Sequence, residues 1–312
     1  LLTFADTTAF EAAFRSLELL VVIDVAMTET ARLAHYVLPA ASQFEKWEAT
    51  GFNLEFPENY FHLRHPLFAP PGEALPEPEI YTRLLERMGL IPERLALLSS
   101  VARLQPEGSQ FLPYLMALRA TLGRRREWQA FAASITYRTL GPTLPRDAAA
   151  AAFLLPLAVQ YAARHGPAVR RAGHDGSART LGGRLFRAIL DGRSGVVISR
   201  HEYADAWSLV RTPDRRVHLA IPEMLRELES LAAEPDGDAT HPFILMAGER
   251  RSYNANQIFR DPAWRKVDKD GAMRLHPKDA AELGLADGDR ATVESETAEI
   301  EVSVEIGDSV RS

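Results

Sequence analysis

The strongest apolar run near the start of the chain is "LELLVVIDV", residues 17–25. Uninterrupted apolar runs of this length are typical of strands buried on both faces, as in parallel α/β sheets. Thr28 follows as an N-cap for a short helix that extends to about residue 35. The segment "YVLP" then predicts a second strand that ends at Pro39. The pattern therefore predicts the beginning of an α/β sheet.

A loop and then a helix are predicted next. Residues 66–78 hold five prolines, a composition typical of an extended, ordered loop. The helix is predicted from about Glu77 to Met88, with Gly89 as its C-terminal stop. Four apolar residues recur on one face of this helix, which we expect to be its buried face: Ile80, Leu84, Leu85 and Met88.

The middle of the chain has little alternation, and residues 92–165 are predicted to be mostly helical. Its most membrane-like segment, residues 148–163, is shorter than the roughly 20 residues of a spanning helix and contains Pro156 and Gln160. A core helix is therefore expected there. Residues 166–180 are predicted to form a loop, followed by a helix in "LGGRLFRAILDG" and a strand in "GVVIS".

The pattern changes after a predicted linker at residues 234–242. "FILMAGE", from residue 243, predicts a buried strand that leads into a polar loop, and "HPKDAAELG" predicts a short helix. "RATVES" and "AEIEVSVEI" alternate with period two, which is typical of strands with one buried face. These elements predict a small β-rich domain, expected to be a barrel that lacks its last strands.

Composition narrows the classes of function. The 312 residues suit roughly two domains. The formal net charge is −6, so nucleic acid is not an expected partner. There is no cysteine, which excludes disulfides and cysteine-ligated metal clusters within this chain. A cytosolic location is predicted, and no direct membrane insertion. Both ends look cut, so we expect a fragment of a longer parent, on which an export signal would not be visible here.

Polar residues that follow the first strand are candidates for ligand binding. Asp24 ends that strand, and ligands of open α/β sheets bind at the carboxyl ends of strands. Its carboxylate suits a ribose diol or a guanine edge, or else it caps the next turn. Thr28 and Thr30 offer hydroxyl and N–H groups to a phosphate, or form an ordinary cap. Lys46 and Asn53 lie in a loop that is expected to return to the same edge of the sheet as Asp24. There Lys46 either forms an ion pair with a phosphate or is exposed to solvent.

A second candidate is the polar loop after residue 246, "MAGERRSYNAN". Gly248 allows close backbone approach to a ligand, and paired arginines such as Arg250 and Arg251 suit a pyrophosphate. Asn254 and Asn256 suit the edge of a heterocycle. An ordinary charged hairpin loop explains the same residues. His62 and His65 have no third ligand nearby, so no metal site is predicted.

Two separated regions resemble the molybdopterin oxidoreductases, the molybdenum or tungsten enzymes that include formate dehydrogenases and nitrate reductases. Residues 19–89 carry "VVIDV", "TETARLAHYVLPA", "EKWEATGFN" and "PPGEALPEPEIYTRL" in the family's order. Residues 242–306 carry "PFILMAGERRSYNAN" and "HPKDAAELGLADGD", as does the family's dinucleotide-binding domain. The resemblance covers roughly half of the chain, and residues 90–240 carry none of the strong motifs.

The resemblance implies a fold and a division into domains. Residues 1–90 would be the end of a Rossmann-like parallel-sheet α/β domain, and residues 91–240 a mostly helical connecting region. Residues 241–312 would be a truncated, double-psi-type β-barrel that binds the molybdopterin dinucleotide. The iron–sulfur domain, with its 4Fe-4S cluster, and the residue that ligates the metal would precede this chain.

The resemblance also implies a function. The chain would be the cofactor-binding C-terminal portion of an oxidoreductase with a bis-molybdopterin guanine dinucleotide cofactor, most similar to formate dehydrogenase. Its partners would be a small-molecule substrate and electron-transfer subunits. No catalytic or metal-ligating residue is assigned in this chain. The implied cofactor-binding residues are Asp24, Thr28, Thr30, Lys46, Asn53, Glu77, Gly248, Arg250, Arg251, Ser252, Asn254 and Asn256.

Several departures from the family pattern indicate a divergent member. His35 replaces an aspartate, the motif reads Ala-Thr-Gly rather than Gly-Thr, and a Gly-Arg pair after Asn53 is missing. Glu249 precedes the two arginines, so either one can fill the family's arginine role. These departures leave an alternative open, a structural subunit of a respiratory complex that keeps the fold but has lost the cofactor.

Overall fold

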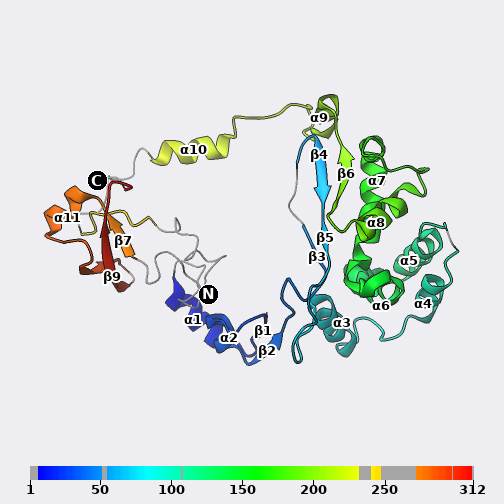
Figure 1. The fold of residues 1–312 in the computed structure, drawn as a ribbon, viewed down its shortest axis with the longest axis horizontal. Coiled ribbons are helices and arrows are strands. Elements are labelled where there is room, and N and C mark those ends of the chain that lie inside the picture. Colours follow the sequence, from blue (N-terminus) through cyan, green and yellow to red (C-terminus); the bar gives the residue numbers. More distant parts are fainter. Residues whose placement is uncertain are drawn as a thin grey trace. The chain divides into compact units, whose positions relative to one another are not determined.

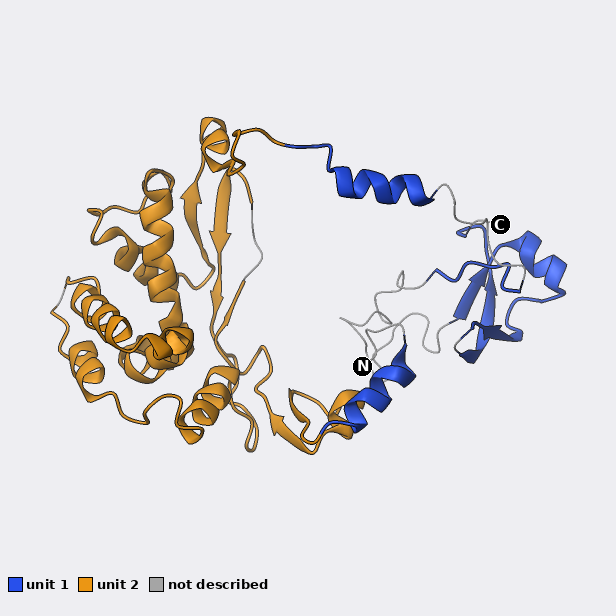
Figure 2. Ribbon diagram, turned by 180° about the vertical axis from the view of Figure 1, so that it is seen from behind, with its two compact units in different colours: residues 1–17, 218–312 blue, residues 18–217 orange. Residues whose placement is uncertain are grey.

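Two compact units make up the chain in the computed structural model, residues 18–217 and residues 1–17 with 218–312 (Figures 1 and 2). The structure describes residues 6–50, 55–106, 108–231, 240–246, 272–296 and 298–310. It contains both helices and small sheets, so the mixed fold class is confirmed. The predicted domain boundaries near residues 90 and 240 stay predictions.

A short parallel strip begins the larger unit. Strand β1 (Val21–Asp24) pairs in parallel with β2 (Tyr36–Pro39), and α2 (Glu29–Leu33) connects them. Residue 75 forms a parallel bridge with residue 40 at the end of β2. The two strands and the connecting helix are thus confirmed, but β1 is shorter than the apolar run that predicted it. The expected burial of this strand on both faces is wrong: none of its residues is buried, and Leu19, Val21 and Val25 are exposed. The strip is preceded by α1 (Thr7–Arg15) in the other unit.

The bridge at Leu75 lies on the opposite side of β2 from β1. The Ala40 amide donates to the Asp24 carbonyl at 3.0 Å, whereas the Ala41 amide donates to the Leu75 carbonyl at 2.9 Å. Successive residues of a strand point their backbone groups to opposite neighbours. The order across the strip is therefore β1, β2 and the segment at Leu75, all running in the same direction.

Helix α3 (Glu77–Arg87) begins directly after this bridge, and Gly89, which has φ +70°, follows its C-cap Met88. Its predicted buried face is only half correct: Ile80 is buried and Leu85 packs on the core, but Leu84 and Met88 are exposed. The reason is electrostatic, because the helix also turns acidic side chains toward α6 (Ala132–Thr139). A buried carboxylate is tolerated when it is paired.

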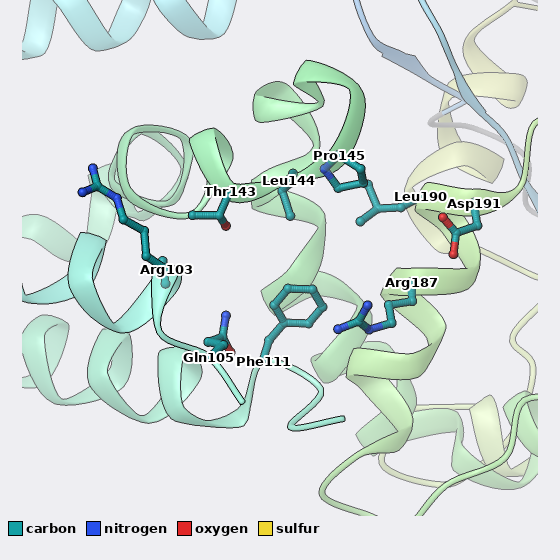
Figure 3. A pocket seen from close by; sticks show the side chains of 10 residues that line it. Arg103, Gln105, Phe111, Thr143, Leu144, Pro145, Arg187, Leu190 and Asp191 are labelled. Carbon is teal, nitrogen blue, oxygen red and sulfur yellow. The ribbon is translucent and has the colours of Figure 1, made fainter. Parts of the chain in front are cut away.

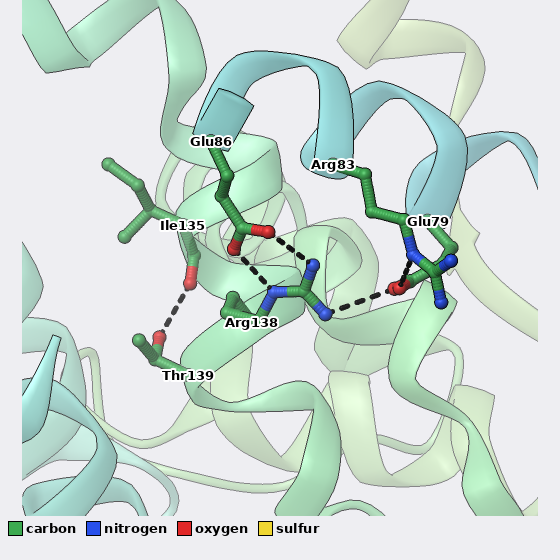
Figure 4. Close-up of polar contacts among 6 residues, drawn as sticks. All are labelled: Glu79, Arg83, Glu86, Ile135, Arg138 and Thr139. Carbon is green, nitrogen blue, oxygen red and sulfur yellow. Dashed lines mark hydrogen bonds and ion pairs between the residues drawn. The ribbon is translucent and has the colours of Figure 1, made fainter. Parts of the chain in front are cut away.

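Arg138 of α6 joins the two helices (Figure 4). It donates from Nε and Nη2 to the two oxygens of Glu86 at 2.7 and 2.8 Å, and from Nη1 to Glu79 at 3.1 Å. Arg83 also donates to Glu79, at 2.6 Å. Burial opposes ionisation of Glu79, but the Arg83 hydrogen bond and the Arg138 charge hold its pKa below the usual value. This network holds α3 against the core. It therefore also fixes the position of the first turn of α3.

The largest core lies in a helical block, which we define as residues 96–191. Its buried centre includes Tyr114, Ile135, Leu155 and Phe186. The elements of the block are α4 (Ala96–Arg103), α5 (Leu112–Arg124), η1 (Arg126–Phe131), α6, η2 (Gly141–Thr143), η3 (Pro145–Asp147), η4 (Ala149–Phe153), α7 (Leu154–Arg171) and α8 (Leu181–Asp191).

Helix α7 confirms the expected core helix and corrects the loop predicted after it. Leu155, Ala158 and Ala162 are buried, and no described helix has the length and apolar character needed to cross a membrane. The helix continues to Arg171 through a kink at His165, so the loop is shorter than predicted. Pro167 does not end the helix, because a proline is tolerated in the first turn after a break.

Two further antiparallel pairs complete the larger unit. Strand β3 (Glu48–Ala49) pairs with β5 (Leu63–Arg64), and β4 (Glu58–Phe61) pairs with β6 (Val196–Arg200), which confirms the predicted strand. Helix α9 (Tyr203–Leu209) follows in this unit, and α10 (Pro222–Leu231) belongs to the other.

The smaller unit contains a three-stranded sheet ordered β7–β9–β8. Strand β7 (Ala272–Leu275) is parallel to β9 (Glu299–Ile306), which is antiparallel to β8 (Arg290–Glu294). Helix α11 (Pro277–Leu283) stops at Gly284, as predicted. The predicted strand at residues 243–246 is wrong: these residues form no strand and their apolar side chains are exposed. A strand requires a hydrogen-bonded neighbour, and none of the described strands pairs with them.

Candidate functional site

The candidate site is the carboxyl-end edge of the parallel strip, which we call the strip edge. Asp24 ends β1, Pro39 lies opposite it at the end of β2, and Leu75 pairs beside β2. Because the three segments run in parallel, the residues that follow them emerge at one edge. Asp24, the loop after β2 and the start of α3 at Glu77 therefore meet there.

Asp24 is half-buried and folds the turn that follows β1. Its Oδ1 accepts from the Val25 amide at 2.7 Å and from the Ala26 amide at 3.4 Å, and its Oδ2 accepts from the Thr28 hydroxyl at 3.1 Å. Thr28 in turn accepts from the Ala31 amide at 3.3 Å as the N-cap of α2. The capping role that the sequence left open is thus observed. A carboxylate offers about four acceptor positions, so Asp24 retains capacity for one more donor.

Lys46 reaches the strip edge through an ion pair with Glu77, although the two residues are far apart in sequence. A second carboxylate, on Glu48, lies 3.6 Å from the same ammonium group. Only 15% of the Lys46 side chain is exposed, against 34% for Glu77. One ammonium group facing two carboxylates leaves the trio with a net negative charge.

Aromatic and backbone contacts fix the loop that carries Lys46. The ring of the adjacent Trp47 lies 4.2 Å from that of His65. Burial first, and then the charge of nearby arginines, lowers the pKa of His65, which favours the neutral form of this imidazole. Arg64 donates to the Gln43 carbonyl at 3.1 Å. These contacts set the position of Lys46 before any ligand is present.

The start of α3 sets the position of Glu77. Pro76 is the N-cap and another proline follows Glu77 in the first turn, both suited to a helix start. A carboxylate in the first turn is also favoured by the helix dipole. The position of Glu77 is thus determined by the helix as well as by Lys46.

The strip edge presents acceptors rather than a free positive charge. Asp24 and Glu77 are carboxylates that accept from N–H and O–H groups, and the charge of Lys46 is already compensated. A phosphate brought to Lys46 would meet two carboxylates within the same cluster, which is unfavourable. The residues present therefore fit the donor groups of a guanine or a ribose better than they fit a phosphate.

The structure brings five of the predicted residues to one region. Asp24, Thr28, Thr30, Lys46 and Glu77 lie at or directly after the strip edge. The remaining seven lie outside the described residues: Asn53, Gly248, Arg250, Arg251, Ser252, Asn254 and Asn256. Cofactor binding by all twelve stays a prediction. Among the residues described, no group of three metal-binding side chains occurs.

Sequence reasoning missed one residue of this region, Glu48, and the structural role of another, His35. Glu48 completes the trio around Lys46, and the spacing of Glu48 two positions after Lys46 is the only local signal for it. His35 accepts from the Leu20 amide through Nδ1 at 2.9 Å, and so ties the entry of β1 to the entry of β2. The histidine that departs from the family pattern therefore has a structural role.

Comparison with known proteins supports the resemblance at both ends of the chain. Residues 1–87 match the family model described as Molybdopterin oxidoreductase, and residues 243–312 match the Molydopterin dinucleotide binding domain. The F420-dependent formate dehydrogenase subunit alpha of Methanocaldococcus jannaschii is 43% identical over 84 residues, which is 27% of this chain. The F420-dependent formate dehydrogenase 2 subunit alpha of Methanococcus maripaludis is 44% identical over 85 residues.

The aligned part of the chain spans 12% of the length of each of these two relatives. Among solved structures, the acetylene hydratase from Pelobacter acetylenicus aligns with 93% of this chain and 31% of its own. The TM-score is 0.42 and the sequence identity 20%.

Proposed function

The chain is a member of the molybdopterin oxidoreductase family through the segments at its two ends, and from this we propose that it is the cofactor-binding portion of a molybdenum or tungsten oxidoreductase. The cofactor would be a molybdopterin guanine dinucleotide, whose metal supplies two-electron redox chemistry when bound. The observation that carries the proposal is the strip edge, which lies within the first matched segment and gathers Asp24, Lys46 and Glu77.

We assign distinct roles to these three residues. Asp24 and Glu77 would accept hydrogen bonds from a guanosine group, through the guanine edge or the ribose hydroxyls. Lys46 would orient Glu77 and contact a polar edge of the cofactor rather than a phosphate, because its charge is compensated. The arginine-containing loop after residue 246 would bind the pyrophosphate, since paired arginines suit that group.

The name of the relatives points to a substrate and partners. Both are alpha subunits of F420-dependent formate dehydrogenases, so we propose a formate-dehydrogenase-like activity for the full-length protein. A subunit designation implies other subunits, and electron-transfer proteins are the proposed partners. The location is proposed to be cytosolic.

A second candidate follows from the same geometry. The charges of the strip edge are satisfied within the chain, since Lys46 pairs with Glu77 and Asp24 caps its own turn. A cofactor-free structural subunit would show the same contacts. Molybdenum, tungsten and pterin analysis of the purified full-length protein separates the two candidates, because only the enzyme contains metal and pterin.

Replacing Asp24 with asparagine is expected to lower the cofactor content of the full-length protein. The amide oxygen still accepts from the Val25 amide, so the turn is retained. The negative charge that favours a guanosine donor edge is lost, and hydrogen bonds to charged groups contribute about 1.5–3 kcal/mol. The cofactor content is measured as the guanine released from the denatured protein per polypeptide chain.

Arg250→Ala is also expected to lower the cofactor content. Full retention of guanine by both variants would show that the site is assigned wrongly.

Replacing Glu77 with glutamine tests whether Lys46 orients Glu77 toward the cofactor or instead binds a phosphate. If Glu77 accepts from the cofactor, the variant loses guanine and metal in parallel with Asp24→Asn. If Lys46 instead binds a phosphate, removing its partner's charge strengthens that contact and raises cofactor retention. We expect the loss of guanine and metal. The trio of Lys46, Glu48 and Glu77 has a net negative charge while Glu77 is ionised, and this charge disfavours a phosphate at Lys46. Glu45→Gln, in the same loop but not paired to Lys46, serves as the matched control.

A further inference from the structure

A cavity and a broken helix are two features of the larger unit that the proposed function does not use. The cavity, of about 240 Å³, lies in the helical block, with Arg187 and Asp191 on one side and Arg103 on the other (Figure 3). Its lining residues include no histidine, the side chain whose charge usually changes between about pH 5 and 8. The broken helix is α7, and at its break, His165, two histidines meet. The break is therefore the feature of the two that can respond to pH.

The break in α7 follows from its sequence. His165 has φ −121° and ψ 27°, which are not helical values, and Gly166 and Pro167 come next. A proline has no N–H group, and its ring collides with the carbonyl group four residues earlier in a regular helix. The hydrogen bonds of α7 are thus interrupted at this point. The part of the helix after the break depends on neighbouring elements to hold it in place.

The ring of His165 contacts two other rings. Its centroid lies 4.7 Å from that of Tyr161, and 5.5 Å from that of His201, which it meets edge to face. His201 directly follows β6, is only 8% exposed, and donates from its amide to the Pro57 carbonyl at 2.7 Å. Strand β6 packs against α7 and leads into α9 (Figure 1). The two imidazoles therefore join the break in α7 to the junction of β6 and α9.

The groups that face His165 disfavour a positive charge on it. Burial is the first cause that lowers the pKa of His165. The charge of His201 is the second, and the charges of Arg164 and Arg211 follow. Tyr161, the remaining titratable neighbour of the ring, stays neutral because burial raises its pKa. No carboxylate contributes to the pKa of His165, so a proton on this ring has no counter-charge there.

His201, in contrast, has a carboxylate nearby, on Asp205 of α9. The Glu202 amide donates to Asp205 at 3.0 Å and is the main cause that lowers the pKa of this carboxyl group, and the charges of Arg171 and His201 add to it. Arg171, at the end of α7, forms ion pairs with Asp205 and Glu202. A positive charge on His201 is therefore compensated, whereas one on His165 is not.

We propose that His165 and His201 form a pH-sensitive latch that holds β6 and α9 on the broken end of α7. One proton on the pair is tolerated, because Asp205 compensates it at His201. A second proton places two like charges in a partly buried contact whose ring centroids are 5.5 Å apart, with two arginines close by, and the contact opens. The latch is independent of the cofactor and of the proposed activity.

Acid is expected to open the latch from about pH 6.5 downward. In the open form His165 is solvated and has its ordinary pKa of 6.5, whereas the pKa is lower in the closed form. The open form therefore takes up the proton first, so the stability of the latch is complete above pH 6.5 and is lost as the pH falls toward the lowered pKa. His174 donates from Nε2 to the Val197 carbonyl of β6 at 2.8 Å, and it still donates when protonated, so it does not cause the opening.

Hydrogen–deuterium exchange of the full-length protein at about pH 8 and pH 5 tests the latch. Mass spectrometry of peptides that cover residues 196–209 reports the protection of β6 and α9, corrected for the intrinsic pH dependence of exchange. We expect protection to fall by at least about threefold at the lower pH, which is the effect of two unit charges at this separation in a water-like dielectric. Equal protection at both pH values overturns the proposal.

Three variants test the assigned histidines. His165→Phe keeps a ring against Tyr161 and His201 but cannot be protonated, so it should retain the protection at pH 8 and lose the fall at pH 5. His165→Gln, which is also uncharged, is expected to lose the fall as well. His65→Phe removes the other described histidine whose pKa is lowered and is the matched control, in which the fall should remain. A fall that persists in both His165 variants, or that disappears in His65→Phe, overturns the proposal. Circular dichroism at pH 8 confirms that each variant is folded.

Discussion

Replacing Gly182 with alanine is expected to lower the free energy of unfolding by about 3 kcal/mol. A Cβ at this position of α8 would lie 2.5 Å from the Cα and 2.8 Å from the Cγ2 of Val159 on α7. The first of these is a backbone atom, so the two helices must separate to accommodate the methyl group. Urea denaturation followed by the helical circular dichroism signal measures the loss.

Gly123→Ala is the matched control for this prediction. Gly123 also lies in a helix, α5, but a Cβ there would meet nothing within 4 Å. Alanine is favoured over glycine in helices by up to about 1 kcal/mol, so this variant should be neutral or slightly stabilised. Equal destabilisation of both variants would show that close packing of α7 and α8 is not the cause.

Arg138→Met is expected to destabilise the larger unit by about 2–3 kcal/mol, which is below the roughly 3–5 kcal/mol for a fully buried pair. The change leaves Glu86 and Glu79 without their shared partner, and their side chains are only 11% and 14% exposed. Chemical denaturation at pH 7 measures the difference. The loss should shrink in acid, where protonation of the two carboxylates removes the uncompensated charge.

Two further variants separate charge pairing from other effects of Arg138. Arg83→Met removes an ion pair to the same Glu79, but the Arg83 side chain is 59% exposed, so the loss should be below about 1 kcal/mol. Adding Glu86→Leu to Arg138→Met should recover part of the stability, because no uncompensated carboxylate remains at that position. If the double variant is as unstable as the single one, the packing of Arg138 matters more than its charge.

Local patterns predicted the elements around the strip edge well. The β2 strand, the Thr28 cap of α2 and the start of α3 agree with the structure. These features depend on short-range rules, such as capping, proline geometry and apolar runs. The strip edge was predicted from the rule that parallel strands end together, and from a family resemblance that the two matching segments confirm.

Features that depend on distant partners were not predictable in the same way. The exposed face of α3 was assigned to the core, because nothing near Leu84 or Met88 indicates that Arg138 draws the acidic face inward. The apolar residues 243–246 satisfy the pattern of a strand, but a pattern cannot provide a pairing neighbour. The Lys46–Glu77 pair joins residues on either side of a proline-rich loop, and no local spacing relates them.

The Lys46 trio has a consequence for the order of maturation. An edge whose charges are paired within the chain does not have to wait for a ligand before it folds. Glu77 is also held by its helix, and α3 is anchored to the helical block through Glu79 and Glu86. Under the proposed function, the edge would therefore form before the cofactor binds, and binding would exchange the partner of one carboxylate.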